Sequence, residues 1–188
     1  PQAMKVWHNT ALGLSWEERG ELDFDELLLR RRQMYNCLVP EQVLVLTAAV
    51  DVQDNRLEYE IVGWGAEKKS WGIQYGVIMG DPGQMETWTA LDDVLFDTYT
   101  RADGQQLQVM TTCIDSGGHY GSEVFAYCRA RESRRVWAIK GRGGAGEAFI
   151  KRPKSRHASG AWLFTIGVDV GKDTLRSRLK VQFPDHAG

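Results

Sequence analysis

The sequence has no apolar segment long enough for a membrane-spanning helix. Its longest apolar run, VLVLTAAV at residues 43–50, is far shorter than the roughly 20 residues that cross a bilayer. The first nine residues, which include Lys5 and Trp7, lack the apolar stretch of a secretory signal. We therefore expect no membrane association and no export, which indicates a cytosolic setting.

Paired cysteines are also missing. The three cysteines, Cys37, Cys113 and Cys128, are odd in number, widely separated and contain no C-x-x-C pair. This argues against a disulfide framework and against a structural zinc site.

Several catalytic motifs are absent as well. The sequence contains no G-x-x-x-x-G-K-[ST] loop, no H-E-x-x-H and no G-x-S-x-G, which removes the support for a P-loop ATP site, a zinc peptidase or a serine hydrolase. GRGGAGE at residues 141–147 superficially resembles a dinucleotide fingerprint, but a basic loop follows it in place of the expected helix.

The charge is distributed unevenly. Residues 129–156 hold ten Lys and Arg against two acids, a net charge of +8, so the rest of the chain carries −10. A basic segment on an acidic body suits a protein that contacts nucleic-acid phosphate locally, and a solvated basic loop without a partner is the alternative. The candidate DNA-binding residues are Lys140, Arg142, Lys151, Arg152, Lys154 and Arg156.

Hydrophobic periodicity predicts one α/β domain over the 188 residues. Leucines at helical spacing predict a leading helical segment within residues 1–40, and the all-apolar run at 43–50 predicts a strand buried on both faces. Further strands are expected at 57–65, 70–78, 107–114, 136–139 and 162–168, helices at 88–99, 122–131 and from about 172, and a Gly-rich basic loop at 141–160. This order predicts a mixed β-sheet flanked by helices on both faces.

Three acids follow apolar runs where strands are expected to end: Asp51, Asp115 and Asp169. Each has a simpler explanation, since Asp51 could cap a turn with Asn55 and Asp115 could cap a helix. Such strand ends can converge in space, and three carboxylates beside one another are the ligands that Mg²⁺ or Mn²⁺ prefers. His119 could contact a scissile phosphate or fill a turn.

Converging carboxylates of this kind suit phosphodiester hydrolysis assisted by two divalent cations, which needs no nucleophilic side chain. The principal hypothesis is therefore a metal-dependent endonuclease that uses Asp51, Asp115 and Asp169. The alternatives are a DNA-binding module whose acids are structural and a resolvase or strand-transfer enzyme of the RuvC type.

Four blocks of sequence resemble the nuclease domain of the phage terminase large subunit of the lambda gpA type. They are VWHNTALGLSWEERGE at 6–21, LVPEQVLVLTAAVDVQDNRLEYEIVGWG at 38–65, IDSGGH at 114–119 and IGVDVGKDTLRSRL at 166–179. The resemblance implies a single nuclease domain over residues 1–188 with an RNase H-like fold, in which Asp51 and Asp115 match the first two acids. The third acid is Asp169, with Asp173 as the alternative.

The same resemblance implies a larger protein whose ATPase motor precedes this domain. That protein would cut concatemeric duplex DNA and package it in the cytoplasm of the host cell. Its expected partners are duplex DNA, a small terminase subunit and the prohead portal.

Overall fold

The computed structural model describes residues 39–144 and 146–180. The chain divides into two compact units, Pro1–Met34 and Tyr35–Gly188, and the described residues all belong to the second. The predicted leading helical segment at residues 1–40 lies almost entirely outside the described residues.

The described residues form a mixed α/β domain around one eight-stranded sheet. Its strands are β1 (Val45–Gln53), β2 (Arg56–Trp64), β3 (Ser70–Met79), β4 (Thr98–Thr100), β5 (Gln106–Asp115), β6 (Val136–Arg142), β7 (Ile150–Lys151) and β8 (Leu163–Gly167). Three α-helices are described, α3 (Met85–Leu95), α4 (Gly121–Ala130) and α5 (Val168–Lys180), with two short 3-10 helices, η1 (Ala66–Lys68) and η2 (Glu132–Arg134). None of the described helices is long and apolar enough to cross a membrane.

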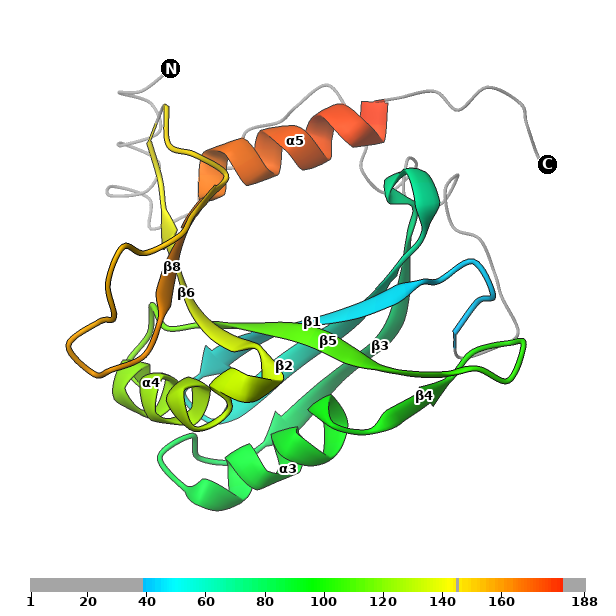
Figure 1. Cartoon of the computed structure of the whole chain (residues 1–188). Helices are drawn as coiled ribbons and strands as arrows, with labels where there is room; N and C mark the ends of the chain where they lie inside the picture. The colour runs from blue at the N-terminus through cyan, green and yellow to red at the C-terminus, as the bar shows by residue number, and fades with distance from the viewer. Residues whose placement is uncertain (1–38, 145, 181–188) are drawn as a thin grey trace, which may run out of the picture. The chain divides into compact units, whose positions relative to one another are not determined.

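The spatial order of the sheet is β3-β2-β1-β5-β6-β8-β7, and β4 pairs with β5 off this path. The first three strands form an antiparallel meander, as the pattern at residues 43–78 predicts. β5, β6 and β8 then run parallel to β1, because long connections separate these strands along the chain, with helices α3 and α4 in the first two and the basic loop with β7 in the third. Figure 1 shows the long central strands crossing the middle of the domain.

Helices α3 and α4 cover one face of the sheet, which we call the helix face. Their apolar side chains, among them Trp88, Leu91 and Val124, join one core cluster with residues of β1, β2, β5 and β6. The opposite face, which we call the open face, carries the alternate residues of the same strands. Figure 1 shows α5 on that opposite side of the sheet, where it packs against β8 and exposes residues 172–178.

The prediction that β1 is buried on both faces is wrong. Leu46, Ala48 and Val50 are buried on the helix face, whereas Ala49 and Asp51 are exposed. The apolar run resembled a doubly buried strand because the residues on its open face are small, and small side chains give no alternation in hydropathy. β1 also continues for two residues beyond Asp51, so this acid lies within the strand and not at its end.

Two further boundaries differ from the predicted ones. The helix expected from about residue 172 begins at Val168, which places Asp169 in its first turn. The helix predicted at 88–99 begins at Met85 and ends at Leu95, and Tyr99 belongs to β4. In the predicted basic loop, β6 extends to Arg142 and the two-residue strand β7 pairs with β8.

Candidate active site

Asp51 and Asp115 lie side by side on the open face. β1 and β5 are parallel neighbours in which Ala49 pairs with Cys113 and Val50 with Ile114. One position further along both strands come Asp51 and Asp115. Since Val50 and Ile114 are buried on the helix face, side-chain alternation directs both carboxylates to the open face. Neighbouring strands lie about 5 Å apart, a separation at which two carboxylates can share a cation.

Neither carboxylate has a cationic partner within the described part of the chain. Asp51 accepts a hydrogen bond from the Gln53 amide, and Asp115 accepts one from the backbone N–H of Gly117 at 3.0 Å. No ion pair to either acid occurs among residues 39–144 and 146–180. Two adjacent carboxylates repel each other, and a divalent cation between them would remove that repulsion. The donor set of this pair, carboxylate oxygens at a solvent-exposed face, therefore fits Mg²⁺ or Mn²⁺.

The described residues contain no group of three or more His, Cys, Asp or Glu side chains close enough to hold a metal ion. The two acids are thus a partial ligand set in the arrangement seen here.

Glu58 extends the acidic row to a third strand, and the sequence analysis did not identify it. It pairs with Asp51 across β1 and β2 and shares the open face. Arg56 donates to one Glu58 oxygen at 2.6 Å and Tyr75 to the other at 3.0 Å, so hydrogen bonding to Arg56, then to Tyr75, lowers the pKa of the Glu58 carboxyl. The alternation RLEYEI at 56–61 places Glu58 on a polar face, but only the register shows that this face contains Asp51.

The loop that follows Asp115 brings His119 to the end of β1. His119 Nδ1 lies 3.1 Å from an Asp54 carboxylate oxygen in the turn between β1 and β2. Ser116 fixes the start of the loop, because its hydroxyl and its N–H both donate to the Ile139 carbonyl. His119 therefore lies at the same end of the sheet as the acid pair.

The structure does not place Asp169 beside this pair. Asp115 is level with Ile139 of β6, which is level with Phe164 of β8. Asp169 is five residues beyond Phe164, two strands away from β5, and accepts a hydrogen bond from the Gly144 N–H at 2.7 Å.

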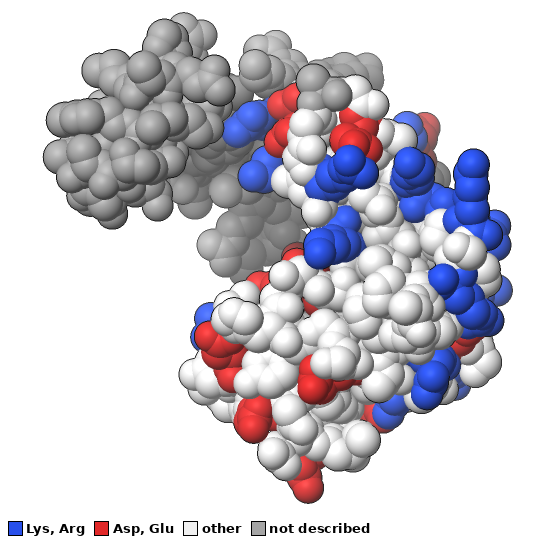
Figure 2. Space-filling model, turned by 90° about the vertical axis from the view of Figure 1, so that its left-hand side faces the viewer, with Lys and Arg blue, Asp and Glu red and all other residues white. Residues whose placement is uncertain are grey.

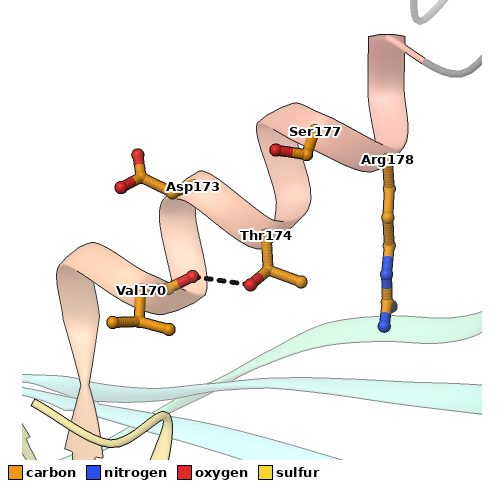
Figure 3. A pocket seen from close by; sticks show the side chains of 5 residues that line it. All are labelled: Val170, Asp173, Thr174, Ser177 and Arg178. Carbon is orange, nitrogen blue, oxygen red and sulfur yellow. Dashed lines mark hydrogen bonds between the residues drawn. The ribbon is translucent and has the colours of Figure 1, made fainter.

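Asp173, the alternative third acid, lies one turn further along α5 and is 3.5 Å from Arg176. Figure 3 shows the Asp173 and Arg178 side chains leaving α5 in opposite directions, with Arg178 directed towards the strands. The hollow drawn there is lined by α5 alone, through Val170, Asp173, Thr174, Ser177 and Arg178. It is therefore an open helix surface and not an enclosed cavity.

Three of the six candidate DNA-binding residues lie on strands at the other margin of the sheet, Lys140 and Arg142 on β6 and Lys151 on β7, and the other three follow β7 in the loop before β8. Lys140, Thr165 and Lys151 form one row across β6, β8 and β7. Because Lys140 follows Ile139, which is level with Asp115, this row belongs to the helix-face side and not to the open face. Figure 2 shows Lys and Arg side chains gathered along the right-hand margin of this view.

Two of these six residues are already paired with acids. Arg142 contacts Glu147 at 3.0 Å, and Arg156 donates twice to Glu132. Glu132 also accepts a hydrogen bond from Trp162, and these bonds, Arg156 first, lower the pKa of the Glu132 carboxyl. Arg156 thus holds the C-terminal part of the basic loop against η2.

An adjacent pair of carboxylates on one face of a mixed sheet, one exposed and one half-buried, is compatible with a domain that acts on phosphodiesters. The family described as "Terminase large subunit gpA, endonuclease domain" matches residues 1–187. The chain belongs to this family, which makes it a DNA-cleaving hydrolase domain.

Two relatives are each 33% identical to this chain. The chain is 33% identical to the terminase large subunit of Enterobacteria phage P21 over 181 residues, which is 96% of this chain and 28% of that protein. It is 33% identical to the terminase large subunit of Escherichia phage lambda over 175 residues, which is 93% of this chain and 27% of that protein. The chain therefore spans little more than a quarter of the length of these relatives. No solved structure matches it.

Proposed function

We propose that this domain hydrolyses phosphodiester bonds of duplex DNA by a two-cation mechanism at a site built on Asp51 and Asp115. The observation that carries the proposal is the register of β1 and β5, which sets the two carboxylates side by side on the open face. The third ligand is proposed as Asp169, with Asp173 as the alternative, and requires that α5 approach the acid pair more closely than it does here.

We also propose that the fold is RNase H-like. The support is topological: a three-stranded antiparallel meander, followed by β5 and β6 parallel to β1, in the order β3-β2-β1-β5-β6. Helix α3 lies between β3 and β4 along the chain, and α4 lies between β5 and β6. The first acid then lies on the first strand, which is the central one of the five.

The residues of this chain would bind the metal ions and orient the carboxylates that hold them. Asp51 and Asp115 would hold the Mg²⁺ or Mn²⁺ ions, while Gln53 and the Gly117 N–H orient one oxygen of each carboxylate. When bound, the two ions would supply charge stabilisation for the attacking and leaving oxygens of the scissile phosphate. The exposure of Asp51 leaves the pair accessible to a DNA strand lying over the open face.

Duplex DNA would be held by electrostatic contacts along the basic margin. We propose Lys140, Arg142, Lys151, Arg152, Lys154 and Arg156 as the residues that contact phosphates. Contacts of this kind are independent of sequence and weaken with salt. Arg142 and Arg156 are partly neutralised by acids, and Lys140 and Lys151 lie on the helix-face side. A duplex over the open face would therefore reach these two lysines only by passing over the sheet edge formed by β7.

We propose further that the full protein is a phage terminase large subunit that cuts and packages viral DNA in the host cytoplasm. The full protein would include an ATPase motor, and a small terminase subunit and the prohead portal would be its partners. The support is the match to the large subunits of phages P21 and lambda, of which this chain corresponds to about a quarter.

A plasmid-nicking assay with Mg²⁺ or Mn²⁺ tests the proposed activity. Asp51→Asn and Asp115→Asn should abolish nicking while leaving the melting temperature unchanged, and chelation by EDTA should abolish it in the parent chain. Asp97→Asn, which changes an exposed acid far from the pair, is the matched control and should cut normally.

The same assay separates the remaining possibilities. Loss of cutting in Asp169→Asn but not Asp173→Asn, or the reverse, identifies the third acid. Unchanged cutting in Asp51→Asn and Asp115→Asn contradicts the proposed site. Salt-sensitive DNA retention without any cleavage by the parent chain would favour a binding module, and preference for branched over linear DNA would favour a resolvase.

A further inference from the structure

Beside the proposed site, an Asp–His pair joins the ends of the two acid-bearing strands. His119 lies in the loop between β5 and α4, and Asp54 lies in the turn after β1. The distance from His119 Nδ1 to Asp54 Oδ1 is 3.1 Å. The pair thus connects the segment that follows Asp115 to the segment that follows Asp51.

Neighbouring contacts fix the place of this pair. The Tyr120 hydroxyl lies 3.3 Å from the Asp54 carbonyl oxygen and 3.2 Å from a carboxylate oxygen of Asp81. On the other side of His119, Gly118 runs close to the Val52 carbonyl of β1, since a Cβ at that glycine would lie 3.6 Å from it. The residues before and after His119 are therefore both held against the rest of the domain.

The contribution of this pair to folding should be small. The His119 and Asp54 side chains are 87% and 80% exposed, and exposed ion pairs add little to stability. What the contact does is orient the imidazole ring. With Nδ1–H donating to Asp54, Nε2 is the ring nitrogen left to face a ligand.

We propose that His119 donates its Nε2–H to a backbone phosphate of the bound DNA next to the bond that is cut, and that Asp54 positions the ring for this contact. This inference rests on the proposed function, because it takes the DNA to lie over Asp51 and Asp115. In this contact Nδ1–H donates to the Asp54 carboxylate and Nε2–H to the phosphate oxygen. His119 contacts DNA, and Asp54 is a positioning residue that acts through it.

One feature of the surroundings agrees with a phosphate ligand. α4 begins at Gly121, two residues after His119, and the N-terminal end of a ten-residue helix adds a favourable partial charge for an anion.

DNA affinity and cleavage kinetics of His119 variants test the proposal. His119→Ala should raise KM for DNA about tenfold with kcat unchanged, because the contact is present in both the bound and the transition state. It should also reduce the slope of log K against log salt by about one. His119→Gln, which keeps an N–H donor, should recover part of the lost affinity.

The Asp54→Ala variant tests whether Asp54 positions His119 or has only a structural role. Asp54→Ala should weaken binding when His119 is present and should have no weakening effect in the His119→Ala background. The matched control is Lys69→Ala, which removes an exposed cation at the opposite end of the β1–β2 hairpin and should leave KM unchanged.

Binding is measured in parallel by fluorescence anisotropy in the Asp51→Asn background, so that it does not depend on activity. If the parent chain shows no metal-dependent cleavage, the proposed function fails, while the anisotropy titration still decides the role of His119. The proposal is overturned if His119→Ala leaves Kd and KM unchanged, if Lys69→Ala weakens binding equally, or if Asp54→Ala weakens binding equally with and without His119.

Discussion

Replacing Asp92 with alanine should destabilise the domain, because Asp92 of α3 accepts hydrogen bonds from Tyr127 of α4 and from Arg131 at the end of that helix. Its carboxylate accepts two hydrogen bonds from the Arg131 guanidinium, one of them at 2.6 Å from Nε, and a third from the Tyr127 hydroxyl at 2.6 Å. The guanidinium also stacks on the Tyr127 ring, 3.8 Å from its centroid. Removing Asp92 leaves a guanidinium and a phenol without their shared acceptor.

The size of the effect follows from the burial of this group. Removing one partner of a fully buried ion pair costs about 3–5 kcal/mol. Here the Arg131 and Asp92 side chains are 21% and 25% exposed, so water replaces part of what is lost. We therefore expect a loss of about 2–3 kcal/mol, discounted from that range because of solvent access. For a domain of this size, that corresponds to a fall of roughly 4–12 °C in melting temperature.

Asp93→Ala is the matched control, since it removes an exposed acid from the next position of the same helix. Its melting temperature should stay close to that of the parent, within about 0.5 kcal/mol in stability. Thermal unfolding followed by circular dichroism compares the variants under one buffer condition. Equal melting temperatures for Asp92→Ala and Asp93→Ala would refute the argument that this network connects the two helices.

Two further predictions concern acid stability and packing. Hydrogen bonds from Arg101 lower the pKa of the Asp103 carboxyl from 3.8 to about 2, so its contribution to stability is present above the unfolded pKa and lost as the pH falls through about 2. Urea titrations should therefore give the parent a larger free energy of unfolding than Asp103→Asn at neutral pH, and this difference should disappear as the pH falls from 3.8 to about 2. A difference in the free energy of unfolding that does not change with pH would contradict this prediction. A Cβ at Gly76 would lie 2.3 Å from the Tyr59 hydroxyl oxygen, so Gly76→Ala should cost about 1–3 kcal/mol by overpacking. Gly72→Ala is the control, because a Cβ at Gly72 would have as its nearest neighbour a Glu60 carboxylate oxygen at 3.9 Å. Equal melting temperatures for the two variants would contradict the prediction and show that the Tyr59 ring moves aside freely.

Much of the sheet could be predicted from the sequence because its strands carry clear local signals. The meander at residues 43–78 and the strand before Asp115 were placed within a few residues, since alternating and apolar runs are bounded there by turn residues. Burial was harder to predict. β1 contains Thr47 and Ala49 on its open face, and hydropathy alone cannot distinguish small exposed residues from buried ones.

The candidate site was predictable only in part. Asp51 and Asp115 stand out because an acid follows an apolar run, and the register of β1 and β5 brings the two together. Glu58 could not be found in this way, because its relation to Asp51 depends on how β2 pairs with β1. The position of Asp169 depends on where β8 ends and α5 begins, and the continuous pattern of residues 166–175 hides that boundary.

The most direct test of the central claim is a crystal structure of the chain soaked in Mn²⁺, with anomalous diffraction used to locate the metal. The account predicts manganese coordinated by carboxylate oxygens of both Asp51 and Asp115 on the open face. Manganese bound elsewhere, with neither of these carboxylates among its ligands, would contradict it.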